Sequence, residues 1–233
     1  EIMPSLVGSE MCIRDRGYTE INANCVYEDG WKPIHATVFY DQLKKLADYI
    51  LEHNLDMEND YYISLFEENF FHPKQPDDLE NWCGGNGVML AVDPDGIIYP
   101  CLRYMESSLA GQQEPYSIGD VDTGICQTEC DRCRVECLKK IDRRTQSTDE
   151  CFNCPVAEGC SWCTAYNYQV FGTPDARATY ICDMHKARAL GNIYFWNHYY
   201  EKNNIDKHME NHVPEEWALN IISKPEWDML CSL

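Results

Sequence analysis

The sequence has few basic residues and no long hydrophobic run. The chain of 233 residues has only 19 lysines and arginines but 39 acidic residues, so its formal net charge is −20. This balance argues against a broad basic surface, and we expect no nucleic-acid partner. The longest apolar stretch, residues 87–92, is far shorter than the roughly 20 residues that span a bilayer, and we expect no membrane partner. A secretory leader is not recognisable, so we expect a cytoplasmic protein.

Cysteine, in contrast, is abundant. The chain has 14 cysteines, and eleven of them lie between Cys83 and Cys182. A chain of this length can bury a hydrophobic core without disulfide staples. Without a secretory route, dense cysteine favours metal ligation over a disulfide framework. The sequence therefore predicts a metal-binding protein.

The start of the chain is unlike the rest. Residues 1–16, which include Cys12, have neither helical nor strand periodicity, and they resemble a translated sequencing adaptor. We interpret them as a non-native segment, and the alternative is a disordered tail. If the segment is foreign, the natural protein is longer at its N-terminus and this chain is a fragment.

Residues 17–80 predict one strand–helix–strand unit and a linker. The expected strands are 18–27 and 61–66, and the helix is 37–54, where apolar residues recur at i, i+3, i+4 and i+7. Such a βαβ unit predicts a parallel sheet. One unit cannot cover both faces of a sheet, so we expect the end of a larger α/β domain, followed by a linker at 71–80.

The remainder predicts an α+β region. Asp93-Pro94-Asp95-Gly96 is a strong turn signal, and it indicates a hairpin between residues 88–92 and 97–99. We expect a charged helix over 123–144, a loop over 151–163 and an aromatic-rich helix over 183–200. The polar tail from residue 201 shows no assignable pattern.

Five cysteines near the end of this region have the spacing of metal ligands. They are arranged as Cys151-x2-Cys154-x5-Cys160-x2-Cys163, with Cys182 further on. A short Cys-x-x-Cys loop holds two thiolates close together, as a metal ion or cluster requires. A zinc ribbon separates its pairs by about 15–20 residues, whereas here the gap is five. Iron–sulfur ligation is favoured, because Cys154-Pro155 is similar to the Cys-Pro end of ferredoxin motifs; zinc stays the alternative.

Two cysteines upstream complete a wider pattern. Cys83 is followed by Gly96, and Gly96-x4-Cys101 ends the hairpin. The seven cysteines together resemble the SPASM domain, the auxiliary-cluster module of many radical S-adenosylmethionine (radical SAM) enzymes. One departure from the family pattern is that two residues, not three, separate Cys160 from Cys163. A residue missing from a loop changes local geometry and leaves the number of ligands unchanged.

The resemblance implies two [4Fe-4S] clusters with interleaved ligands. The first would be held by Cys83, Cys101 and Cys163, with no fourth ligand assigned. An iron left open there would bind a substrate thiolate. The second would be held by four cysteines: Cys151, Cys154, Cys160 and Cys182.

The resemblance also implies an architecture. Residues 17–80 would form the C-terminal βαβ fragment of a partial TIM-type barrel plus a linker. The SPASM domain would cover residues 81–200 and contain the β-hairpin, the cluster loops and helices. A C-terminal tail would occupy residues 201–233.

The cysteine loop and the segment after it look like a narrower group, the radical SAM maturases that act on precursor peptides with Cys-x-x-x repeats. This likeness implies a precursor-peptide substrate, an electron donor such as flavodoxin or ferredoxin, and a thioether product. S-adenosylmethionine would bind only the full-length oxidoreductase, because this chain has no plausible barrel Cys-x3-Cys-x2-Cys loop. We expect the fragment alone to be inactive. The alternatives are a standalone electron carrier or peptide-binding module, or a zinc-stabilised binding domain.

Four cysteines between the two halves of the pattern are left over: Cys126, Cys130, Cys133 and Cys137. The first three have the spacing of the radical SAM cluster motif, but they lie far from the start of a barrel, and Arg132 stands where that motif commonly has an aromatic residue. On a helix the four positions share one stripe. We expect a buried helix face; the alternatives are a fourth ligand for the first cluster or an extra metal site.

Other polar residues near these cysteines have simpler interpretations. His185 is expected to be a core or surface residue rather than a ligand. A local basic group is expected to be a solvated face: Lys139, Lys140, Arg143 and Arg144. The glycines that follow Cys83 are expected to let backbone N–H groups approach cluster sulfurs.

Overall fold

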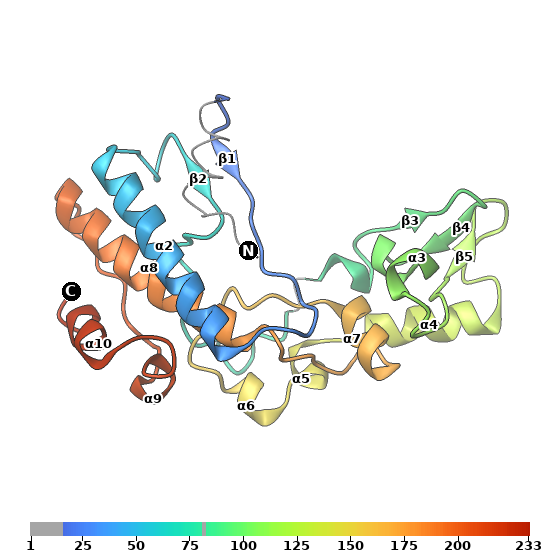
Figure 1. Cartoon of the computed structure of the whole chain (residues 1–233). Helices are drawn as coiled ribbons and strands as arrows, with labels where there is room; N and C mark the ends of the chain where they lie inside the picture. The colour runs from blue at the N-terminus through green and yellow to red at the C-terminus, as the bar shows by residue number, and fades with distance from the viewer. Residues whose placement is uncertain (1–15, 81–82) are drawn as a thin grey trace. The chain divides into compact units, whose positions relative to one another are not determined.

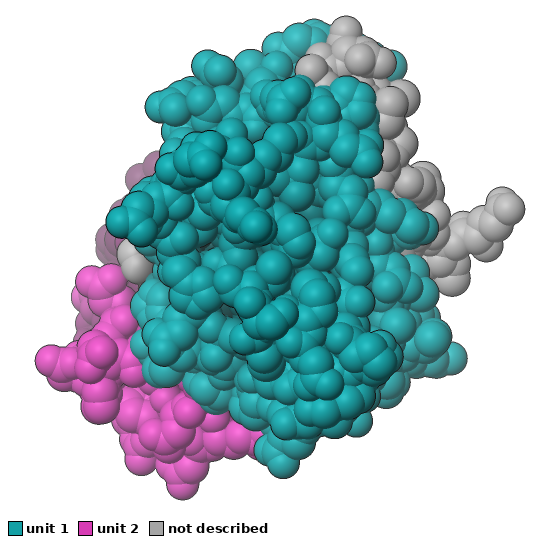
Figure 2. Space-filling model, turned by 90° about the vertical axis from the view of Figure 1, so that its left-hand side faces the viewer, with its two compact units in different colours: residues 1–73, 155–160, 180–233 teal, residues 74–154, 161–179 magenta. Residues whose placement is uncertain are grey.

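A computed structural model of the chain describes residues 16–80 and 83–233 and divides into two compact units (Figure 2). Unit 1 contains the described residues of 1–73, together with 155–160 and 180–233; unit 2 contains the described residues of 74–154, together with 161–179. The α+β class is confirmed by the mixture of helices and two small sheets. The prediction for Cys12 lies outside the described residues.

No helix in the described part of the chain combines the length and apolar character needed to cross a membrane.

Unit 1 contains the predicted βαβ unit (Figure 1). Strand β1 (Glu20–Ile21) pairs in parallel with β2 (Tyr62–Ile63), and helix α2 (Pro33–Glu52) connects them. The parallel pairing is confirmed, but β1 is much shorter than the predicted 18–27. The helix begins at Pro33 instead of near residue 37, because the fixed φ of proline suits the first turn of a helix.

Helix α8 (Cys182–Asn203) packs against α2 to form the core of unit 1. The predicted apolar face of α2 is confirmed, since Leu43, Leu46 and Ile50 are all buried. A Cβ on Gly191 of α8 would lie 2.9 Å from Leu43 Cδ1, so glycine lets the two helices approach closely. Each fully buried aliphatic side chain contributes about 1.5–3 kcal/mol relative to its exposed state.

The C-terminal tail, which carries no clear sequence pattern, folds onto unit 1. It forms α9 (Glu215–Ala218) and α10 (Lys224–Leu230), and Trp227 and Leu230 are buried. Glu226 fixes α10 to α2, because it accepts hydrogen bonds from Tyr40 Oη at 2.7 Å and Lys44 Nζ at 2.5 Å.

The described part of unit 2 contains a small antiparallel sheet with the strand order β3-β4-β5-β6. The strands are β3 (Ala91–Val92), β4 (Ile97–Tyr99), β5 (Gly119–Asp120) and β6 (Gly124–Ile125). The hairpin of β3 and β4 is confirmed, with β3 shorter than the predicted 88–92. At Gly119 φ is +154°, and a Cβ would lie 2.2 Å from the Gly124 carbonyl oxygen, so only glycine fits this pair of strands.

The helices of unit 2 are short. They are η1 (Gly84–Asn86), η2 (Leu102–Tyr104), α3 (Glu106–Leu109), α4 (Glu129–Lys139), α5 (Arg143–Gln146), α6 (Asp149–Phe152) and α7 (Thr164–Phe171). The prediction of one helix over 123–144 is wrong. Thr128 caps α4 by accepting from Asp131 N at 3.0 Å, and Asp142 starts α5 by accepting from Thr145 N at 2.7 Å. The predicted loop over 151–163 holds beyond the end of α6.

Candidate functional site

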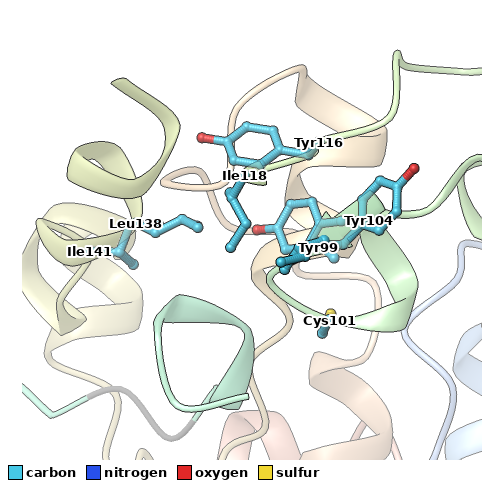
Figure 3. Close-up of a cluster of buried hydrophobic side chains, with 9 residues drawn as sticks. Tyr99, Cys101, Tyr104, Tyr116, Ile118, Leu138 and Ile141 are labelled. Atoms are coloured by element: carbon cyan, nitrogen blue, oxygen red, sulfur yellow. The ribbon is translucent and has the colours of Figure 1, made fainter. Parts of the chain in front are cut away.

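The predicted ligand Cys101 lies at the edge of the small core of unit 2 (Figure 3). The buried members of this core are Ile98, Tyr99, Cys101, Tyr104, Tyr116, Ile118, Leu138, Ile141 and Ala165. Tyrosine rings form its centre: the ring centroids of Tyr104 and Tyr116 lie 5.0 Å apart, and those of Tyr116 and Tyr168 lie 4.9 Å apart. The aromatic packing fixes η2, which begins directly after Cys101.

The sulfur atoms of Cys83 and Cys101 both lie near Gly85. A Cβ placed on Gly85 would lie 3.4 Å from Cys101 Sγ, 3.6 Å from Cys83 Sγ and 3.2 Å from Thr164 Oγ1. Cys83 Sγ is also 3.3 Å from Thr164 Oγ1. The absence of a side chain at position 85 therefore lets the backbone approach both sulfurs closely; the expected role of the glycines after Cys83 stays a prediction.

Cys163 is the third sulfur of this neighbourhood. It caps α7, where its Sγ accepts a hydrogen bond from Tyr166 N at 3.4 Å. It is also close enough for electrostatic interaction with both Cys83 and Cys101. Cys163 thus stands next to Thr164, the residue that Cys83 Sγ contacts. That the three cysteines are ligands of the first cluster stays a prediction.

Burial governs the protonation of these thiols. It raises the pKa of Cys101, a trend that the nearby Cys83 reinforces and that backbone N–H groups of Arg103 and Tyr104 oppose. Burial likewise raises the pKa of Cys163 to about 11, although the N–H of Tyr166 and the charge of Arg103 both act to lower it. Both groups therefore hold their protons at neutral pH, and metal binding would release them.

Within the described ranges, no three Cys, His, Asp or Glu side chains surround a common point suited to one metal ion. In a cubane, each cysteine binds a different iron and the sulfurs stay apart. Backbone N–H groups interact with the sulfurs of Cys101 and Cys163, as such a cluster would require, but that a cluster binds here stays a prediction.

The four cysteines predicted for the second cluster are divided between the units. Cys151 lies in α6 and, like Cys154, belongs to unit 2, whereas Cys160 and Cys182 belong to unit 1. Cys182 is the first residue of α8, and Cys160 N donates to the Ala157 carbonyl oxygen at 3.1 Å. The second ligand set therefore stays a prediction.

The expectation that the four leftover cysteines form a buried face is wrong. Cys130 and Cys133 of α4 are exposed, and Cys126 and Cys137 are only half-buried. The inward face of α4 is instead formed by residues such as Leu138. These cysteines hence need an explanation other than core packing.

Two polar predictions have different outcomes. His185 takes the structural role expected of it, because its Nε2 lies 2.9 Å from the Val156 carbonyl oxygen and its ring packs 5.2 Å from Phe71. The basic group is not a uniformly solvated face, since Arg143 is 2% exposed, although Lys139 and Lys140 are exposed.

The sequence did not predict the buried, hydrogen-bonded role of Arg143 near the cysteines. Its guanidinium donates to the carbonyl oxygens of Gln75 at 2.8 Å and Asp78 at 2.9 Å, and also to that of Phe152, which lies between Cys151 and Cys154. Thr164, beside Cys83, was missed as well. Its position directly after Cys163, a cysteine of the motif, was the only available signal in the sequence.

Comparison with protein-family models, with curated proteins and with solved structures finds no match for this chain.

Proposed function

We propose that unit 2 holds an auxiliary [4Fe-4S] cluster on Cys83, Cys101 and Cys163, as part of a radical SAM enzyme that modifies a precursor peptide. The observation that supports this most directly is the gathering of the three cysteines around Gly85 and the start of α7. They come from three separate segments, and their order resembles the SPASM pattern, with the one shorter gap before Cys163.

The residues of this chain would prepare the site. Burial beside the tyrosine core excludes water from Cys101. N–H groups of Arg103, Tyr104 and Tyr166 donate toward the sulfurs and stabilise their charged form. When bound, such a cluster supplies a site that accepts one electron. A second cluster on Cys151, Cys154, Cys160 and Cys182 belongs to the same proposal.

The fourth position of the first cluster is the proposed contact with the substrate. The resemblance assigns only three cysteines to it, and a thiolate from the precursor peptide would complete the set. Thr164 Oγ1 lies beside Cys83 Sγ, so it borders the proposed contact.

Anaerobic reconstitution followed by iron and sulfide analysis tests the proposal. We expect about eight irons per chain in two cubanes, with matching acid-labile sulfide and cubane Mössbauer parameters. The variant C83S/C101S/C163S should lose about half of this iron, because one of two equal clusters is removed. C231S, which changes a cysteine outside the pattern, should keep all of it. Stoichiometric zinc without acid-labile sulfide would contradict the proposal.

A further inference from the structure

Strand β3 lies at an open edge of the small sheet in unit 2 (Figure 1). Its one neighbour among the described strands is β4, where Val92 stands opposite Ile98. Asp93 N donates to the Ile97 carbonyl oxygen at 3.1 Å, whereas the Ile98 carbonyl oxygen accepts from Ile118 N at 2.8 Å, on the side of β5. Because bonded and non-bonded pairs alternate in an antiparallel ladder, the N–H and C=O of Val92 point away from β4. This edge can therefore accept a further strand.

The segment that leads into this edge is an exposed apolar run. Residues 88–92 are Val-Met-Leu-Ala-Val, without a charged or polar side chain. Four of the five are at least half exposed: Val88 at 87%, Met89 at 50%, Leu90 at 60% and Val92 at 51%. Proteins commonly protect a sheet edge with charges, proline or a bulge, because an exposed apolar edge pairs readily with another chain. An apolar edge without such protection indicates a partner.

The charge around this edge indicates the kind of partner. Residues 83–125 contain a single basic residue, Arg103, and six acidic ones: Asp93, Asp95, Glu106, Glu114, Asp120 and Asp122. The turn after β3 and the turn after β5 are neighbours, because Val121 N donates to the Gly96 carbonyl oxygen at 2.9 Å. Asp95 and Asp122 are exposed in these two turns. Their negative charge favours a basic partner and disfavours a second copy of this acidic chain.

We propose that β3 binds an extended peptide with alternating apolar and basic residues, which adds to the sheet as a further strand. The main chain of the peptide would pair with the N–H and C=O of Val92. Leu90 and Val92 are two residues apart, so in an extended chain they share one face, and the apolar side chains of the peptide would cover them. The basic side chains would lie near the acidic turns. The site uses no proposed cluster ligand, so the inference does not rest on the proposed function.

Fluorescence anisotropy with a labelled peptide of sequence Lys-Val-Lys-Val-Lys-Val-Lys, added to the anaerobically purified chain, tests this surface. Wild type should bind the peptide, and binding should weaken as the salt concentration rises. A peptide with glutamate in place of every lysine should bind at least about tenfold more weakly, because its charge is that of the turns. Asp95→Asn/Asp122→Asn should reduce the affinity for the lysine peptide several-fold at low salt. Hydrogen exchange over residues 88–93 should slow when the peptide binds.

Two variants of the edge separate strand pairing from nonspecific charge attraction. Val92→Pro removes the outward N–H and keeps the hydrogen bonds between β3 and β4, since proline is tolerated at a free sheet edge. It should weaken binding about tenfold or more, with unchanged circular dichroism and iron content. Val88→Ser/Leu90→Ser, which removes only exposed apolar side chains, should weaken binding to a similar degree.

Leu219→Ser, at an exposed apolar position of unit 1, is the matched control and should bind as wild type does. Equal affinity of wild type and both edge variants, or an equal loss in Leu219→Ser, would overturn the inference. A dimer of the chain that forms without peptide and is lost in Val92→Pro would also overturn it and assign the edge to a second copy. Because the iron content should be the same in all these variants, failure of the peptide site would leave the cluster proposal untouched.

Discussion

The two units are stabilised in different ways. Unit 1 packs a 20-residue and a 22-residue helix against each other, whereas α4, the longest helix in the described part of unit 2, has 11 residues. The strands of unit 2 have two or three residues each. A region with so little regular structure and so small a core needs another source of stability, and metal ligation is a general one. We therefore expect unit 2 to depend on the proposed first cluster for its stability and the helical core of unit 1 not to.

Removal of the proposed clusters should have the largest effect and should separate the units. Ligands from positions 83 to 182 close long loops, so metal loss should increase the chain entropy of unit 2 in particular. We expect amide hydrogen exchange to become much faster over 83–154 and 161–179, while α2 stays protected.

Hydrogen exchange read by mass spectrometry before and after anaerobic chelation measures this difference. A mock-treated sample that keeps its iron is the control. Unchanged protection in unit 2 after complete iron loss would show that its core is sufficient without metal.

A core mutation in unit 1 should have the opposite effect: it should destabilise unit 1 and leave the stability of unit 2 unchanged. Leu43→Ala removes a fully buried side chain opposite Gly191 and should lower the free energy of unfolding of unit 1 by about 2–5 kcal/mol. Urea unfolding followed by helical circular dichroism gives the magnitude. Lys45→Ala, at an exposed position of the same helix, should change it by less than about 0.5 kcal/mol. Loss of more than about half of the bound iron in Leu43→Ala would contradict this selectivity, because all assigned ligands of the first proposed cluster lie in unit 2.

The same contrast explains how much of the fold could be predicted. Helix α2 could be predicted from the sequence, because its buried side chains recur with the helical period. Leu43, Leu46 and Ile50 are examples. Strands β5 and β6 could not, because two residues show no alternation. The C-terminal tail was also missed, since Trp227 and the single carboxylate of Glu226 anchor it where no periodic stripe does.

The candidate site follows the same logic. The resemblance to the SPASM domain implies that Cys83, Cys101 and Cys163 share one site. The structure places Cys83 Sγ and Cys101 Sγ beside Gly85, and that the three cysteines are ligands stays a prediction. Helix periodicity gave the wrong environment for Cys130 and Cys133: a stripe of cysteines on α4 is equally compatible with the face that points to solvent. Only tertiary contacts distinguish the two faces of a short helix.

Substitution of Arg143 should weaken unit 2 by an intermediate amount. Arg143→Met leaves three backbone carbonyls without their charged donor, and we expect a loss of about 2–4 kcal/mol in the stability of unit 2. The segment with Cys151 and Cys154 should loosen, because Phe152 lies between them. Urea titration with hydrogen exchange over 143–154 measures both effects.

Arg144→Met is the matched control for this substitution. Arg144 also lies over the Phe152 ring, at 4.6 Å, but its side chain is 56% exposed. Its loss should cost less than about 1 kcal/mol. Equal effects of the two substitutions would show that the ring contact, and not the buried hydrogen bonds, holds this segment.

The smallest effect should come from the ion pair that attaches α10 in unit 1. Burial alone would raise the pKa of Glu226, but hydrogen bonds from Lys44 and Tyr40 outweigh it, so the pKa lies below the usual value of 4.5. The stabilisation from this carboxylate is therefore complete above about pH 4.5 and disappears as the pH falls through its lowered pKa. Glu226→Gln should cost at most about 1 kcal/mol at neutral pH, because the pair is partly exposed.

The difference in unfolding free energy between wild type and Glu226→Gln, followed from about pH 7 to about pH 3, measures this contribution. It should shrink toward zero at the acid end, since the protonated acid and the amide are both neutral there. Glu201→Gln, at an exposed position of α8, should show no such trend. A difference that grows on acidification would mean that folding raises the pKa of this carboxyl above its usual value instead of lowering it. Because Trp227 and Leu230 of α10 are themselves buried, loss of this pair should weaken the attachment of α10 without detaching the helix.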